Sequence, residues 1–128
     1  PSICSNLNID HKHLIQLYKN ANSNTLIKKI TIGSGIRYDM LITKDHQFDK
    51  NNHLSEYLDI VVKNHVSGRL KVAPEHTSNQ VLKMMRKPSF DNFELFYQKF
   101  AKANKRFQLN QQLIPYFIAS RMYISRYG

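Results

Sequence analysis

Apolar side chains recur every three or four positions in three stretches of the sequence, a spacing typical of helices that bury one face. Asp10 lies near the expected N-cap of the first. A fourth helix is predicted from Thr77 and Gln80, which are spaced as a capping box, and it ends before Pro88. The predicted helices cover residues 10–22, 54–64, 77–86 and 91–105. In the last, we expect one stripe to be core: Phe93, Phe96, Tyr97, Phe100 and Ala101.

Three short apolar stretches, two between these helices and one after the last, favour β-strands. They are residues 26–32, which stop at Gly33, residues 70–73, which Pro74 closes, and residues 113–119. Because helices and strands alternate, we predict an α/β fold with about three parallel strands and helical crossovers. Three strands leave two alternatives, a small three-layer sheet or a segment of a larger (βα) barrel.

Polar residues follow each predicted strand, in segments 33–39, 74–78 and 120–121. The carboxyl ends of parallel strands meet at one rim, so we expect these segments to gather there. For each charged residue alone, a solvated loop is the competing interpretation. The candidates are Ser34 with nearby backbone amides for an anion, Glu75 and His76 for hydrogen bonding or proton transfer, and Arg37 and Lys87 as carboxylate or phosphate partners.

Two shorter motifs point to metal or nucleotide binding, but neither carries the prediction alone. His11 and His13 form a His-x-His pair, yet they open a predicted helix, where residues two apart do not face the same way. The Gly33-Ser34-Gly35 segment is half of a phosphate loop, and the rest of the motif does not follow. We therefore predict no metal site among these residues.

The chain carries 19 Lys and Arg against 9 Asp and Glu, a net charge of +10. Such an excess raises the alternative of a polyanion-binding surface. Most cations are scattered, which favours an ordinary solvated surface. The local concentrations are Lys83, Arg86 and Lys87, followed by Lys99, Lys102, Lys105 and Arg106.

Several features of the sequence lead us to expect a cytosolic chain that is a piece of a longer protein. It has no apolar run of membrane-spanning length and no signal-like start, and one cysteine, Cys4, can form no internal disulfide. The chain begins at Pro1, in what resembles the middle of a loop. We therefore predict an internal fragment of a cytoplasmic protein without membrane contact.

The polar segments, together with their flanking strands, resemble the YgiQ family of radical S-adenosylmethionine (SAM) proteins. The matching strings are Ile-Gly-Ser-Gly-Ile-Arg-Tyr-Asp at 32–39, Arg-Leu-Lys-Val-Ala-Pro-Glu-His-Thr-Ser at 69–78 and Pro-Tyr-Phe-Ile at 115–118. Shorter matches extend the resemblance from Pro1 to about Ser120. Long strings of this kind are more specific than a spaced motif.

The resemblance implies a partial barrel of six strands and helices, of which residues 1–120 would be the C-terminal part. It also implies a Cys-x-x-x-Cys-x-x-Cys loop, upstream of Pro1, that holds a 4Fe-4S cluster at which SAM is reductively cleaved. Cys4 is not assigned to the cluster. The fragment alone is then expected to be inactive. The substrate of the parent enzyme is unknown. Residues 121–128 depart from the family pattern and form an atypical tail.

Similarity to other radical SAM enzymes, including methylthiotransferases, implies roles for individual residues. Glu75 would contact the ribose of SAM and Lys87 its carboxylate, with Arg86 as the competitor of Lys87. Ser34 and Arg37 would line the same cavity. The alternative for Glu75 is an acid that interacts with the positive end of the following helix.

Two further interpretations stay open at this point. One is a non-enzymatic nucleic-acid-binding module that uses the basic residues between 83 and 106, which would reflect an RNA substrate of the parent protein. The other concerns assembly, since open sheet edges in a partial barrel favour self-association.

Overall fold

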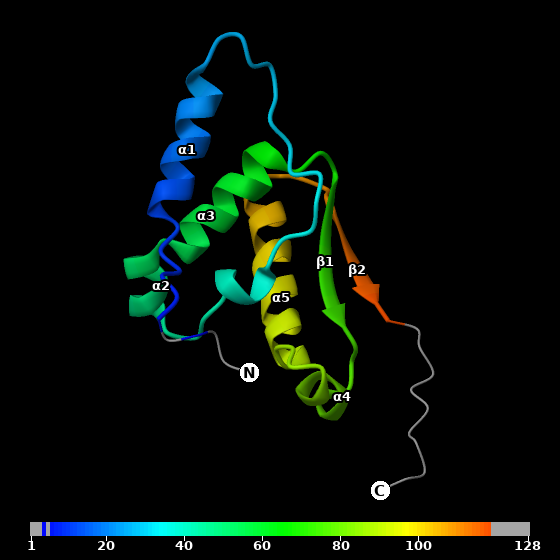
Figure 1. The fold of residues 1–128 in the computed structure, drawn as a ribbon. Helices are drawn as coiled ribbons and strands as arrows, with labels where there is room; N and C mark the ends of the chain where they lie inside the picture. Colours follow the sequence, from blue (N-terminus) through cyan, green and yellow to red (C-terminus); the bar gives the residue numbers. More distant parts are fainter. Residues whose placement is uncertain (1–3, 5, 119–128) are drawn as a thin grey trace, which may run out of the picture.

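A computed structural model describes residue 4 and residues 6–118 of the chain. The described part contains five α-helices, two short helical turns and two strands (Figure 1). In chain order the elements are α1 (Lys12–Ser23), the 3₁₀ turn η1 (Tyr38–Leu41), α2 (His46–Asn52), α3 (Leu54–Ile60), the π-helical turn η2 (Val61–His65), β1 (Arg69–Glu75), α4 (Asn79–Met84), α5 (Phe90–Arg106) and β2 (Gln112–Phe117).

The two strands are parallel neighbours, joined by a crossover through α4 and α5. Along β1 buried and exposed residues alternate, with Leu70, Val72 and Pro74 turned inward. Figure 1 shows α1, α3 and α5 together on one side of the strands. The α/β class and the parallel pairing are therefore confirmed, whereas the wider (βα) barrel stays a prediction.

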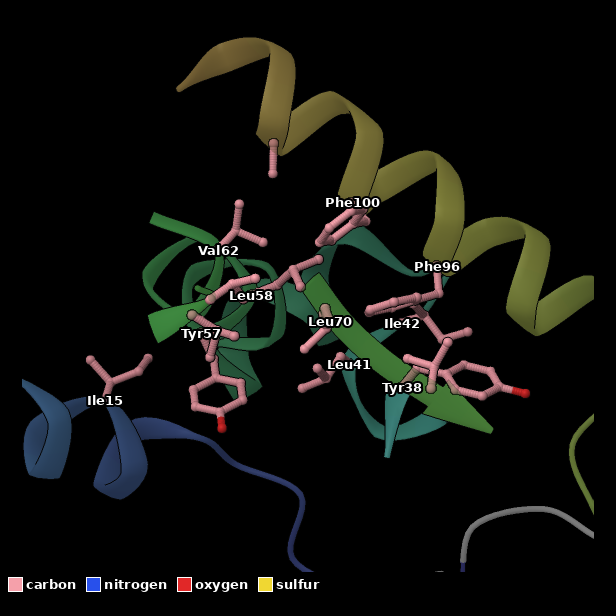
Figure 2. Packing of buried hydrophobic residues seen from close by; sticks show 14 residues of the cluster. Ile15, Tyr38, Leu41, Ile42, Tyr57, Leu58, Val62, Leu70, Phe96 and Phe100 are labelled. Carbon is pink, nitrogen blue, oxygen red and sulfur yellow. The ribbon is translucent and has the colours of Figure 1, made fainter. Parts of the chain in front are cut away.

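One hydrophobic cluster joins the helices to β1 (Figure 2). Leu58 and Val62 of the α3–η2 segment meet Leu70 of β1, and Phe96 and Phe100 of α5 close the cluster. All five side chains are at most 3% exposed. Burial of this kind contributes about 1.5–3 kcal/mol for each large apolar side chain, so this cluster is the main source of stability.

The predicted strand at 26–32 is wrong for the part of the chain that the structure describes. Leu26 is 90% exposed and Ile27 is 40% exposed, so the first half of the segment packs on nothing, and Ile32 at its end is only partly buried against the core. Strand propensity acts through side-chain packing and pairing, and without them the segment stays irregular. Isolated hydrogen bonds to His65 tie its end to the fold: Ile32 N donates to His65 O, and Ile30 O lies 3.0 Å from His65 Nδ1.

Three predicted helices are confirmed to within a few residues, as α1, α3 with η2, and α5. Two details differ. The capping box of the 77–86 helix does not form, because α4 starts at Asn79 after Ser78 and has no side-chain cap. On α5, Tyr97 is 55% exposed and Ala101 is also exposed, so the buried face is narrower than the predicted stripe.

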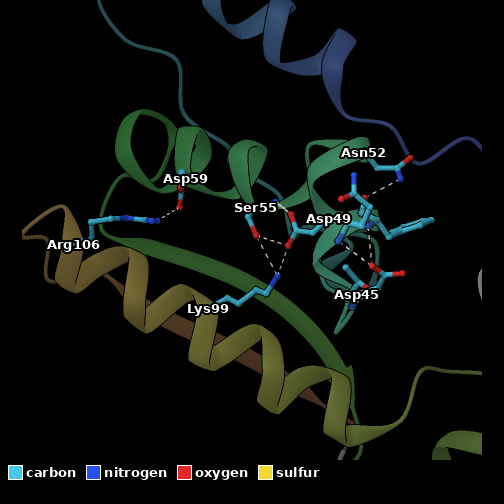
Figure 3. A network of polar contacts seen from close by, with 10 residues as sticks. Asp45, Asp49, Asn52, Ser55, Asp59, Lys99 and Arg106 are labelled. Carbon is cyan, nitrogen blue, oxygen red and sulfur yellow. Dashed lines mark hydrogen bonds and ion pairs between the residues drawn. The ribbon is translucent and has the colours of Figure 1, made fainter.

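Helix α2 was missed because its sequence lacks an apolar stripe. Its start is nevertheless well capped, since the Asp45 side chain accepts hydrogen bonds from Gln47 N and Phe48 N. A polar network then ties α2 and α3 to α5 (Figure 3): Lys99 Nζ donates to Asp49 Oδ2 at 2.7 Å and to Ser55 Oγ at 3.2 Å. The cations of α5 therefore hold helices together.

Candidate functional site

Glu75 lies at a distorted end of β1. Its φ angle is +70°, and His76 N donates to Pro74 O at 2.9 Å across it, which is a γ-turn of the rare left-handed form. The pairing with β2 is also irregular here: Val72 pairs with Pro115, but Glu75 pairs with Phe117. One extra residue on β1 forms a bulge, a feature that redirects a side chain at the end of a strand.

The segment between Glu75 and α4 is held by a side chain rather than by the predicted capping box. Ser78 N donates to His76 Nδ1 at 2.9 Å. In the neutral ring the proton is therefore on Nε2, because Nδ1 is the acceptor. This bond fixes the turn by which the chain leaves β1 and begins α4.

The end of α4 places two cations. Lys87 N donates to Leu82 O at 2.9 Å and Arg86 N donates to Lys83 O at 3.1 Å, the bond pattern of a Schellman motif. Arg86 occupies its left-handed position, with φ +55°. Pro88 follows at once and restricts the backbone of Lys87.

Glu75 and Lys87, which are twelve residues apart in the sequence, meet across α4. Lys87 Nζ lies 3.4 Å from Glu75 Oε1, with side chains 42% and 20% exposed. Among the described residues the first amides of α4 donate no hydrogen bond to Glu75. Lys87, and not the helix start, is thus the partner that the structure gives to this carboxylate.

Arg37 lies opposite, just before η1. Its Nε donates to Asp39 Oδ1 at 3.1 Å and its Nη2 to the other carboxylate oxygen, a two-point contact that raises the pKa of the Arg37 guanidinium. Tyr38, which lies between Arg37 and Asp39 in the sequence, is 4% exposed and packs on Phe93 and Phe96. Burial, with the charges of Asp39 and Glu75, raises the pKa of Tyr38 to about 12, so its hydroxyl stays protonated.

A cavity of about 240 Å³ lies between η1 and the end of α4. The structure therefore brings together Arg37 and Lys87, as predicted, and adds Arg86. Ser34 is not among the lining residues: it is exposed, in a bend, as a solvated loop residue would be. Glu75 is not among the lining residues either, although its carboxylate pairs with Lys87, which is. The cavity is lined by Ile36, Arg37, Tyr38, Asp39, Ala73, Arg86, Lys87 and Pro88.

The histidine pair at the start of α1 does not converge on one point. His11 is 6% exposed and stacks on Tyr57 with ring centroids 4.7 Å apart, and its burial lowers its pKa; His13 is exposed. In the described part of the chain, no three His, Cys, Asp or Glu side chains are grouped so that they could hold a metal ion. Nor does any helix there have the length and apolar character of a membrane span.

The polyanion surface and the third rim segment stay predictions. Among the basic residues, Lys87, Lys99 and Arg106 pair with Glu75, Asp49 and Asp59. The rim segment Ser120-Arg121 and the tail at 121–128 lie outside the described residues.

Sequence reasoning missed the parts of the site that depend on backbone conformation. It gave no role to Tyr38 or Asp39, although Asp39 is two residues after Arg37 and such spacing permits an ion pair. It named Arg86 as a competitor of Lys87 and as one of a local concentration of cations, but not as a residue with left-handed backbone conformation. The signal for the left-handed turn was Pro88, which ends the helix without showing which residue reverses the chain.

Comparison with known proteins gives relatives along nearly the whole chain. A UPF0313 protein of Bacteroides thetaiotaomicron is 52% identical over 120 residues, and one of Porphyromonas gingivalis is 47% identical over the same length. A third, from Chromobacterium violaceum, is 42% identical. The chain is similar to UPF0313 proteins over 94% of its length.

UPF0313 is the YgiQ family, so these relatives carry the family name that the sequence strings predict. The chain spans 19% of the length of the first two relatives and 14% of the third. No family model matches the sequence, and no solved structure matches it.

Proposed function

We propose that this chain is part of a radical SAM enzyme and that it contributes residues of the SAM site. The observation that carries the proposal is the meeting of Glu75 and Lys87, 3.4 Å apart at the carboxyl end of a parallel strand. Ligands of α/β proteins bind at such strand ends. By the resemblance to radical SAM enzymes, Glu75 would contact the ribose of SAM and Lys87 would contact its carboxylate.

The chemistry of the pair suits these roles. An ammonium group pairs with a carboxylate, and a carboxylate accepts hydrogen bonds from two ribose hydroxyls. In SAM the ribose and the amino-acid carboxylate are on opposite sides of the sulfonium, so Glu75 and Lys87 would have to separate to reach both. Lys87 would exchange one carboxylate partner for another, and Glu75 would turn to the hydroxyls.

The iron–sulfur cluster needs ligands from outside this chain, because Cys4 is its one cysteine. When present, a 4Fe-4S cluster supplies the electron for reductive cleavage of SAM. Anaerobic treatment of the isolated chain with iron and sulfide should therefore yield no stoichiometric 4Fe-4S absorbance. The nucleic-acid-binding alternative stays a prediction that no specific contact favours.

SAM binding to the full-length protein that contains this segment tests the proposal. By equilibrium dialysis, Glu75→Ala should weaken binding roughly tenfold or more, while Glu75→Gln retains part of the affinity, because an amide oxygen still accepts from a hydroxyl. Glu56→Ala is the matched control, since Glu56 forms an exposed ion pair with Lys19. Unchanged SAM affinity in a less stable Glu75→Ala protein would refute the proposal.

A further inference from the structure

Arg86 is an unusual residue type for its backbone conformation. The left-handed position that ends a helix is usually filled by glycine, or sometimes by asparagine, because other side chains crowd the backbone there. Arg86 holds φ +55° at this position. Local strain of this kind persists where the surrounding structure or a function requires it.

The surroundings of Arg86 point to an anion. It lines the 240 Å³ cavity together with Arg37 and Lys87. Arg37 is paired with Asp39, and Lys87 is paired with Glu75. Among the described residues Arg86 has no acidic partner, so it is the uncompensated positive charge of the cavity.

The size of the cavity limits what it can take. Whole small molecules occupy pockets of roughly 300–1,000 Å³, more than is available here. Planar guanidinium groups match carboxylate and phosphate oxygens in two-point contacts. We propose that this cavity is an oxyanion subsite, and that Arg86 is the residue that determines its binding of a carboxylate or phosphate group.

Two sources of the group are separable by experiment: the amino-acid carboxylate of SAM, in which case the inference deepens the proposed function, or the substrate of the parent enzyme. The probes are inorganic phosphate and S-adenosylhomocysteine, titrated into the whole chain while the Arg Nε–H resonances and the melting temperature are followed. Phosphate should shift the Arg86 resonance. Arg86→Asn should weaken phosphate binding roughly tenfold, as expected for the loss of a charge-assisted contact.

The stability of the same variant separates ligand binding from folding. Because asparagine tolerates the left-handed region, Arg86→Asn should melt at the wild-type temperature or a few degrees higher. Arg86→Gly is the second variant, and Lys83→Ala is the control that removes a nearby exposed cation outside the cavity. Lys83→Ala should change phosphate affinity less than about twofold.

The outcomes are distinct. If S-adenosylhomocysteine also depends on Arg86, the subsite takes the carboxylate of SAM. If phosphate binding alone depends on Arg86, the subsite stands with an oxyanion of the substrate as its occupant, and the assignment of the SAM carboxylate to Lys87 is unaffected. If phosphate leaves the wild-type Arg86 resonance unmoved, or binds Arg86→Asn and Arg86→Gly as tightly as wild type, the inference is overturned.

Discussion

Lys99 offers the sharpest test of how this small fold is held together. Its ammonium group lies 2.7 Å from Asp49 Oδ2, and the two side chains are only 22% and 13% exposed. Exposed ion pairs contribute about 0–1 kcal/mol, whereas removing one partner of a fully buried pair costs about 3–5 kcal/mol. This pair is mostly buried, so Lys99→Met should lower the free energy of unfolding by about 1–3 kcal/mol.

A second ion pair on the same helix is the control. Arg106 pairs with Asp59, but its side chain is 58% exposed. Arg106→Met should therefore cost less than about 1 kcal/mol. Both variants are measured by urea unfolding followed by circular dichroism at pH 7. If Arg106→Met destabilises the chain as much as Lys99→Met does, burial does not set the strength of these pairs and the reasoning is refuted.

The pH dependence gives an independent check on Lys99. Burial by itself would raise the pKa of Asp49, but the bonds from Lys99 and Ser55 together lower it below 3.8. An acid with a depressed folded-state pKa stabilises the fold above its unfolded value, and this contribution is lost as the pH falls through the folded value. The deficit of Lys99→Met should accordingly shrink below about pH 3.8. A constant deficit down to pH 2 would contradict the assignment.

Three further predictions follow from the core and the α4 turn. Phe96→Ala should lower the free energy of unfolding by about 3–5 kcal/mol and Tyr97→Ala by less than about 1, measured by urea unfolding; similar losses would contradict the orientation of α5. His76→Asn should keep the turn, because its Oδ1 replaces Nδ1 as acceptor for Ser78 N, whereas His76→Gln should cost about 1 kcal/mol; equal melting temperatures would contradict this bond. In hydrogen exchange, α3 and α5 should be protected and residues 24–31 should exchange rapidly; rapid, uniform exchange would mean that no persistent core exists.

The helices were predictable where the sequence itself contains the partner-facing stripe. Residues 54–64 repeat apolar side chains at helical spacing, and their burial follows from that pattern alone. The segment 26–32 shows the converse, since its β-branched residues need a neighbouring strand that the described chain does not supply. Helix α2 depends on the Asp45 cap and on the contact of Asp49 with Lys99, a residue fifty positions away.

The site was predictable in its residues but not in its geometry. The resemblance singled out Glu75 and Lys87, and the structure places them in contact. It also pointed to Ser34, which the structure leaves exposed and outside the cavity. That difference has a physical cause: Glu75 and Lys87 are held by the ends of a strand and a helix, while Ser34 follows a segment that forms no strand.

The two residues with left-handed backbone conformation on either side of α4, Glu75 and Arg86, link the core to the site. Each such conformation costs about 1–2 kcal/mol for a residue with a side chain. Six residues of helix are too few to hold both turns without help. Leu82 supplies that help, since its side chain is 1% exposed and its carbonyl accepts the bond from Lys87 N. Burial of one leucine therefore sets the direction of Lys87, and the contact between Lys87 and Glu75 depends on the core.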